Sequence, residues 1–169
     1  MEQSSPSVAE CRRIALLSAR IPRDWWVVCP DDPTAEVAAC AAAVLAGPAR
    51  VLAVTPGGAV PASRRLAAAG LRTRVHLISG SAQGVGASWR APVGLLCLPG
   101  HPRALRALLA AWSGHVSPRG YVAFYGGGPR DRSGGGAWTP AALGLRGELW
   151  AAHPGDGARP LLLVRRPHG

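Results

Sequence analysis

Acidic, hydroxyl and imidazole side chains follow four short apolar segments, where they can take part in binding or proton transfer. Two carboxylates, Asp31 and Asp32, come directly after the first of these segments. Hydroxyl groups follow the next two as Thr55 and Ser81, and a histidine, His101, follows the fourth. The carboxylates can accept hydrogen bonds from ligand hydroxyls or from backbone amides. The histidine can act as a general acid or base near neutral pH, and a capping or surface role is its alternative.

The elements that position these side chains are predicted by the alternation of apolar runs with alanine- and leucine-rich segments. This alternation favours βαβ units and a mostly parallel sheet. Strands are expected at Trp25–Cys29, Arg50–Val54, Val75–Ser79, Gly94–Leu98 and Tyr121–Phe124. Ligands bind at the carboxyl ends of the strands in open α/β sheets. We therefore expect the polar residues named above to lie at one edge of the sheet, together with Tyr125.

Helices are expected before the first strand and between the later ones. The segment from Ser7 to about Ala19 should form a helix that packs on the sheet. Asp32 suits the cap of the next helix, Pro33 suits its first turn, and Gly47 suits its end. A further helix should run from Pro61 to Ala69.

The helix that follows the fourth strand has the clearest pattern. Its apolar residues recur at i, i+3, i+4 and i+7, as Leu105, Leu108, Leu109 and Trp112. This spacing predicts one apolar face packed on the sheet, so we interpret the stripe as core.

The last third of the chain departs from the alternation. A glycine-rich loop, GGGPRDRSGGG at 126–136, is expected to be either a lid over the strand ends or disordered. A short helix can begin near 139–140. The segment GELWAAHPGDGARPLLLVRR then predicts two strands, about Glu148–Ala152 and Pro160–Arg165, around a turn at Asp156. An antiparallel hairpin would then close the parallel sheet.

This order of elements resembles the class I S-adenosylmethionine-dependent methyltransferase fold, and within it the small-molecule methyltransferases. The segments AAAGLRTRVHLISGSA and VGLLCLPGHPRALRALLAAWSGHVSPRGYVAFYGG look like the third strand of that family and its fourth strand, helix and fifth strand. The resemblance implies a three-layer, Rossmann-like α/β domain whose mostly parallel sheet ends in an antiparallel hairpin. It divides the chain into an N-terminal helical segment, 1–24, and a methyltransferase-like domain, 25–169.

The residues at the cofactor positions depart from the family pattern. Where the family has an acid and a glycine-rich turn, this chain has VVCPDDPTAEV. Asp31 and Asp32 would occupy the helix amides that a ligand carboxylate uses. The resemblance places Thr55 at the ribose-binding acid, Ser81 at the adenine-binding acid, and Pro99 at the aspartate that ends the fourth strand. We therefore expect S-adenosylmethionine to bind weakly or not at all, so that the protein has no cofactor unless the family function is retained.

Charge and aromatic content bear on the partners of the protein. Nineteen basic residues, all of them arginine, face nine acidic residues, and the formal net charge is +10. The arginines are dispersed, which favours an acidic protein partner over nucleic acid. Six tryptophans exceed what one small core needs, and one or two can anchor an interface. A homo-oligomer or an acidic protein partner is expected, and a small-molecule ligand is an alternative.

The cysteines and the hydropathy of the chain indicate its surroundings. Cys11, Cys29, Cys40 and Cys97 form no C-x-x-C pair, and no apolar run is long enough to cross a bilayer. We expect reduced thiols in a cytoplasmic protein with no membrane contact. Burial in the core is favoured over metal ligation for these side chains.

Two functions of different classes follow from these observations. The first is a diverged methyltransferase-fold protein that has lost standard cofactor binding and acts as a partner subunit or scaffold. The second is an enzyme, which either methylates small molecules through atypical cofactor contacts or uses the site for other chemistry. Convergence of the polar groups at the strand ends on a well-formed pocket favours the enzyme, whereas filling of that pocket by Pro30 and Pro33 favours the scaffold.

Overall fold

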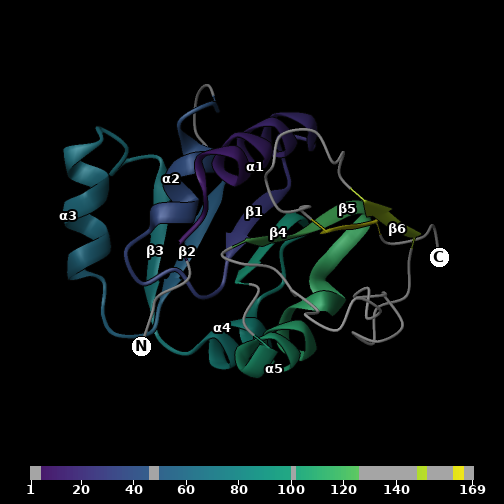
Figure 1. Cartoon of the computed structure of the whole chain (residues 1–169). Coiled ribbons are helices and arrows are strands. Elements are labelled where there is room, and N and C mark those ends of the chain that lie inside the picture. Colours follow the sequence, from purple (N-terminus) through teal and green to yellow (C-terminus); the bar gives the residue numbers. More distant parts are fainter. Residues whose placement is uncertain (1–4, 46–49, 100–101, 126–147, 152–161, 166–169) are drawn as a thin grey trace.

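One mixed sheet organises the protein. The computed structural model describes residues 5–45, 50–99, 102–125, 148–151 and 162–165. Seven strands form the sheet in the order β3-β2-β1-β4-β5-β7-β6. The first five are parallel to one another: β1 (Trp26–Cys29), β2 (Val51–Thr55), β3 (Val75–Ser79), β4 (Val93–Pro99) and β5 (Val116–Tyr125). Helices cover both faces of this sheet (Figure 1).

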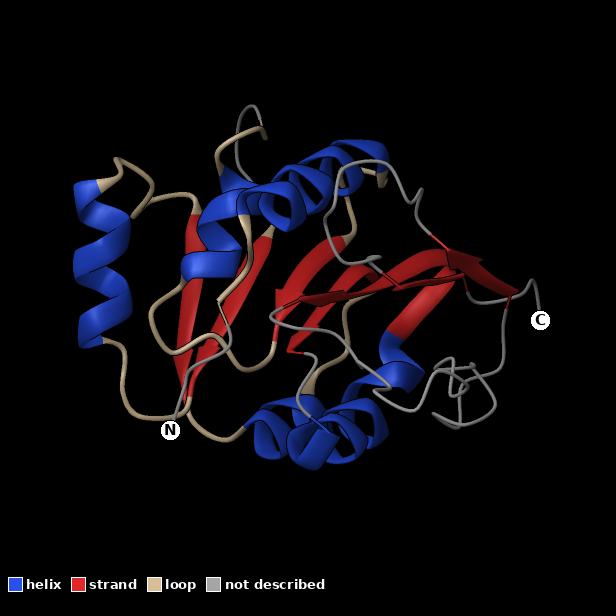
Figure 2. Cartoon of the chain, in the orientation of Figure 1, coloured by secondary structure: helices blue, strands red, loops and turns tan. Residues whose placement is uncertain are grey.

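The hairpin expected at the end of the chain is confirmed. β6 (Glu148–Ala151) and β7 (Leu162–Arg165) pair antiparallel. β7 also pairs antiparallel with β5 and lies between β5 and β6. Figure 2 shows the strands of the sheet in red. Five parallel strands followed by this insertion confirm the predicted α/β architecture. The turn at Asp156, the loop 126–136 and the helix near 139–140 lie outside the described residues.

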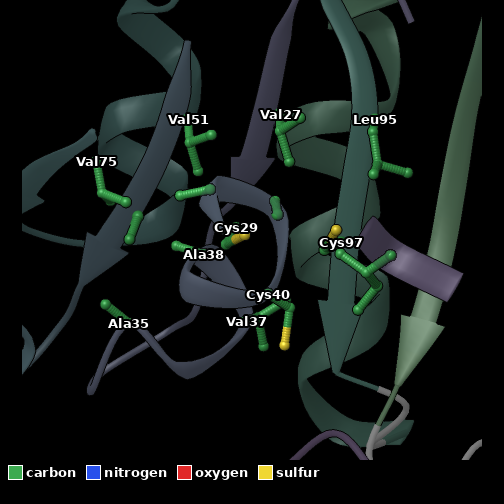
Figure 3. Packing of buried hydrophobic residues seen from close by; sticks show 14 of the residues in the cluster. Val27, Cys29, Ala35, Val37, Ala38, Cys40, Val51, Val75, Leu95 and Cys97 are labelled. Carbon is green, nitrogen blue, oxygen red and sulfur yellow. The ribbon is translucent and has the colours of Figure 1, made fainter. Parts of the chain in front are cut away.

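Two groups of helices pack on opposite faces of the sheet. α1 (Val8–Arg20), α2 (Glu36–Ala42) and α3 (Val60–Ala68) cover one face, and α4 (Ala82–Ser88) and α5 (Pro102–Trp112) cover the other (Figure 1). Successive side chains of β1 divide between two cores, because side chains alternate across a strand. Val27 and Cys29 enter the core under α1–α3, whereas Val28 enters the core under α4 and α5. Figure 3 shows the first of these cores.

α1 begins where the sequence predicts it. The Ser7 hydroxyl accepts a hydrogen bond from the Glu10 amide at 3.1 Å, and the Glu10 carboxylate accepts one from the Ser7 amide at 2.9 Å. This capping box satisfies two amides that the first turn of a helix leaves without partners. Ile14 and Leu17 then carry the buried face of the helix.

α5 packs its predicted stripe against the sheet. Leu105, Leu108, Leu109 and Trp112 are all buried. The indole N–H of Trp112 donates to the carbonyl of Ala82 at 2.9 Å, which ties α5 to the start of α4. The interpretation of this stripe as core is confirmed.

The start of α2 corrects the predicted helix boundary. The helix begins at Glu36, and its N-cap residue is Ala35 rather than Asp32. Asp32 lies before the helix, but its carboxylate still accepts hydrogen bonds from backbone amides of the first turn. The helix ends at Ala42, and the residue expected to end it, Gly47, lies outside the described residues.

Two further elements differ from the sequence-based expectation. β5 begins at Val116, five residues before Tyr121, because Val116 pairs with Val93 before the register with β4 shifts. α4 lies between two strands, where a helix was expected, but no residue bounds were predicted for it; its sequence AQGVGAS contains two glycines. One of them, Gly86, is needed for packing: a Cβ there would lie 2.9 Å from the carbonyl oxygen of Ala111.

A disulfide corrects the expectation of four reduced thiols. Cys11 of α1 and Cys40 of α2 are bonded, with their Cα atoms 5.3 Å apart. Their sequence separation of 29 residues gives no local signal of the pairing. Cys29 and Cys97 are free and buried, as expected. None of the described helices is long and apolar enough to cross a bilayer.

Candidate functional site

The Asp32 carboxylate binds backbone amides at the start of α2. Its two carboxylate oxygens accept hydrogen bonds from the backbone N–H groups of Val37 at 3.3 Å and Ala38 at 2.9 Å. Its own amide donates to the carbonyl of Val54 at 3.1 Å, so the loop after β1 is also fixed to β2. The side chain is only 3% exposed. The positive end of this short helix is therefore neutralised from within the chain.

Burial decides the charge state of Asp32. Desolvation raises the pKa of its carboxyl group to about 6, although the amides of Ala38, Val37 and Glu36 oppose the shift. Among the described residues no basic side chain forms an ion pair with it. The carboxyl group consequently changes charge between mildly acidic and neutral pH.

Asp31 and Tyr125 come together at the ends of β1 and β5. The Tyr125 hydroxyl donates to the backbone carbonyl of Asp31 at 3.1 Å. Tyr125 is 1% exposed, and burial raises its pKa well above the ordinary value. Asp31 is partly buried, which raises the pKa of its carboxyl group. The tyrosine therefore acts as a neutral donor that holds the loop, rather than as a base.

Thr55 lies inside the end of β2 rather than in a loop after it. Its side chain is completely buried, and its hydroxyl donates to the carbonyl of Ile78 at 3.4 Å. Its backbone carbonyl accepts hydrogen bonds from the amides of Gly58 and Gly80. The polar atoms at this strand end are thus paired within the chain, and Thr55 holds the ends of β2 and β3 together.

The remaining predicted site residues have separate environments. Ser81 caps α4, since its hydroxyl accepts a hydrogen bond from the Gly84 amide at 3.0 Å, and the side chain is exposed. Pro99 is buried as the last residue of β4. His101 lies outside the described residues. The structure therefore brings Asp31, Asp32 and Tyr125 together and assigns Ser81 a structural role.

Two buried thiols lie beneath the loop after β1. Cys29 and Cys97 sit at neighbouring positions on β1 and β4 (Figure 3). A hydrogen bond between the two thiols raises the pKa of Cys29, and burial raises it further. Both side chains are completely buried in the core, and the Cys29 thiol is neutral. No set of three or more His, Cys, Asp or Glu side chains is placed to hold a metal ion in the described part of the chain.

Sequence reasoning missed Ala35, the residue between the Asp32 loop and α2. Ala35 has φ 56° and ψ 29°, the left-handed region that favours glycine. An alanine in this conformation costs about 1–2 kcal/mol, and its side chain is completely buried. No spacing or residue type in the sequence indicates this backbone conformation, because alanine is normally a helix former.

Known proteins provide the comparison for this geometry. No protein family matches the sequence, and a search of curated proteins gives no match. Solved structures do match. A methyltransferase from Geobacter sulfurreducens has a TM-score of 0.74 and 20% sequence identity, over 98% of this chain and 81% of the other. A protein from Corynebacterium glutamicum has a TM-score of 0.73 and 14% identity, over 98% and 83% of the two chains.

A third match covers both chains completely. It is a putative rRNA methylase from Clostridium thermocellum, with a TM-score of 0.64 and 15% identity. At these identities the matches establish the fold alone. The chain has the class I methyltransferase fold, and the sheet order described above agrees with the resemblance seen in the sequence.

Proposed function

We propose that this protein keeps the methyltransferase fold without ordinary S-adenosylmethionine binding, and that it acts as a binding subunit or scaffold for an acidic protein partner. One observation carries the first half of the proposal. The Asp32 carboxylate already accepts hydrogen bonds from two amides at the start of α2, the groups that a ligand carboxylate would use. A ligand carboxylate would have to displace a buried charge and would be repelled by it.

The other strand ends support the same conclusion. Thr55 and Ser81 provide hydroxyl groups where the family resemblance places acids, and both hydroxyls already have partners within the chain. A hydroxyl supplies one hydrogen bond but no charge for a sulfonium or a ribose. The residues present therefore do not fit the cofactor well, and we derive no methyl-transfer step through it.

The partner half of the proposal rests on the outer face of α1. Val8 and Leu16 are 76% and 62% exposed, and Arg12 lies between them at helical spacing and is also exposed. Residues at i, i+4 and i+8 lie along one side of a helix. This surface, which we call the α1 stripe (Val8, Arg12 and Leu16), combines apolar and basic groups. It fits a partner with apolar side chains and acidic neighbours, in keeping with the net charge of +10.

Calorimetric titration tests the cofactor half. We expect no measurable heat when S-adenosylmethionine or its demethylated product is added to the purified protein at concentrations up to about 1 mM, which corresponds to affinities weaker than about −4 kcal/mol. Micromolar binding with a stoichiometry near one would show the proposal to be wrong. Turnover of a small molecule by the isolated chain would favour the enzyme instead.

Light scattering, followed by recovery of a bound protein from the native extract at moderate salt, tests the partner half. Leu16→Glu places a charge in the α1 stripe and should reduce recovery of the partner. Val60→Glu is the matched control, since Val60 is also 62% exposed but lies on α3. Equal recovery with both variants, or a monomer that retains no partner, would contradict the assignment of this surface.

A further inference from the structure

The disulfide between Cys11 and Cys40 joins two helices, and one of its two cysteines is partly exposed. Cys11 is partly exposed on α1, whereas Cys40, near the end of α2, is 8% exposed. The bond links α1 to the helix whose first-turn amides bind Asp32. It therefore acts on the loop after β1 through α2, although it lies outside that loop.

Polar contacts of Glu36 join α2 to the segment before α1 and to α3. The Ser5 hydroxyl, before α1, donates to the Glu36 carboxylate at 2.9 Å. The other oxygen of that carboxylate accepts from Arg65 of α3 at 3.3 Å. Both contacts are solvent-exposed and contribute little by themselves. The covalent bond is thus the strong connection between α1 and α2 on this side.

We propose that Cys11 and Cys40 form a reversible thiol–disulfide site, which clamps α1 to α2 when oxidised and loosens both helices when a dithiol reduces it. A thiolate of the dithiol attacks the sulfur of Cys11, the more exposed of the two residues, the bond to Cys40 breaks, and Cys40 leaves as a thiolate that takes up a proton. The second thiol of the reductant then releases Cys11. Two electrons and two protons pass to the protein, and the dithiol becomes a disulfide. This proposal does not depend on the proposed function.

The structure provides for the reduced form. The Cys40 sulfur lies 3.4 Å from the backbone carbonyl oxygen of Glu36, where a thiol can donate a hydrogen bond. α1 keeps its buried side chains Ile14 and Leu17 and its capping box when the bond opens. Reduction should therefore loosen α1 and the first turn of α2 without unfolding the sheet.

The other two cysteines cannot take part in this reaction. Cys29 and Cys97 are completely buried in the core, where a reductant or an attacking thiolate cannot reach them. Attack on a disulfide requires an accessible thiolate. A count of the thiols that react in denaturant therefore separates the two pairs: two thiols when Cys11 and Cys40 are bonded, and four when they are reduced.

The first experiment measures this count. The whole chain is equilibrated with oxidised glutathione or with dithiothreitol and then alkylated in denaturant. Its mass is measured by mass spectrometry before and after proteolytic digestion. We expect two labels after oxidation, a Cys11–Cys40 linked peptide, and four labels after reduction. Four labels in the protein equilibrated with oxidised glutathione would overturn the proposal.

The second experiment measures hydrogen exchange in the two states of the wild-type chain. We expect amides of α1 and those of Val37 and Ala38 to exchange about tenfold faster or more after reduction, while amides of β4 do not change. The double variant Cys11→Ser/Cys40→Ser, with no bond to reduce, should give the same pattern with and without dithiothreitol. Identical exchange in oxidised and reduced wild-type protein would show that the disulfide does not restrain α1 and α2.

Discussion

Asp32 carries a carboxylate into the interior next to the strand ends, and two backbone amides stabilise it there. In an unfolded chain an aspartate has a pKa of about 3.9, whereas in the folded protein burial raises the pKa of Asp32 to about 6. The folded state therefore binds this proton more tightly. Its contribution to stability is fully present below about pH 4 and is lost as the pH rises through about 6.

The first prediction follows from this shift. Raising the pH from about 4.5 to about 7 should lower the free energy of unfolding of the wild type by on the order of 2 kcal/mol more than that of Asp32→Asn, which cannot titrate. Urea unfolding at the two pH values measures the difference. Asp24→Asn, at an exposed position, is the control and should follow the wild type. Parallel pH profiles for the wild type and Asp32→Asn would contradict the burial of this charge.

Ser81 is the second residue whose role can be separated by substitution. Ser81→Ala removes the hydroxyl that accepts from the Gly84 amide, so it should lower the free energy of unfolding by about 1 kcal/mol. It should leave the response to S-adenosylmethionine unchanged. Ser88→Ala, at the exposed end of the same helix, is the control and should have no such cost. If Ser81→Ala instead weakened the binding of S-adenosylmethionine and left the free energy of unfolding unchanged, Ser81 would be a binding residue rather than a helix cap.

At the scale of elements, alternation was enough to predict the parallel strands, the α5 stripe and the closing hairpin. Apolar periodicity reports which side of a segment is buried, and that information is local. The predicted start of α2 was wrong because Ala35 takes a left-handed conformation at a position buried in the core. The predicted start of β5 was wrong because Val116 pairs with Val93 ahead of a register shift between β4 and β5. Neither the Ala35 conformation nor the Val116–Val93 pairing is indicated by the residues nearby in the sequence.

Gly120 allows that register shift. A Cβ at this position would lie 2.7 Å from a methyl carbon of Val116, 2.8 Å from the carbonyl oxygen of Ser117 and 3.1 Å from that of Val93. Two of these atoms belong to backbone and cannot move alone. Gly120→Ala should therefore lower the free energy of unfolding by about 2–3 kcal/mol.

The control for this prediction is Gly57→Ala, because nothing lies within 4 Å of a Cβ built there. Its effect should stay within about 0.5 kcal/mol. Thermal and urea unfolding of both variants provide the comparison. An unchanged midpoint for Gly120→Ala would mean that β5 does not approach β4 as closely as described.

At the scale of the whole molecule, the candidate site was harder to predict than the fold. The sequence identified Asp31, Asp32 and Thr55 as lying at the strand ends, and their positions there are confirmed. It did not show that Asp32 binds amides five and six residues further along the chain, or that Tyr125 binds the Asp31 carbonyl 94 residues away. Such contacts depend on loop geometry, which residue type alone does not specify.

The disulfide has a thermodynamic consequence for the whole chain. It closes a loop with a sequence separation of 29 residues, and a cross-link of that length stabilises a protein by about 3–4 kcal/mol in the chain-entropy estimate. Urea unfolding of wild-type protein with and without dithiothreitol should show a loss of this order. Cys11→Ser/Cys40→Ser should have the lower stability in both conditions, and a dithiothreitol effect on that variant would point to another cause.

Three indole rings meet where α4, α5 and β1 pack. Trp26 and Trp89 have centroids 5.2 Å apart and nearly perpendicular planes, and Trp89 and Trp112 are 5.9 Å apart. At such separations the excited states of the rings couple, so the group gives the protein an optical signature in near-ultraviolet circular dichroism. That signal is lost when side-chain packing loosens while the helices persist. The face opposite the disulfide thus contains its own spectroscopic reporter, which can be read without label or ligand.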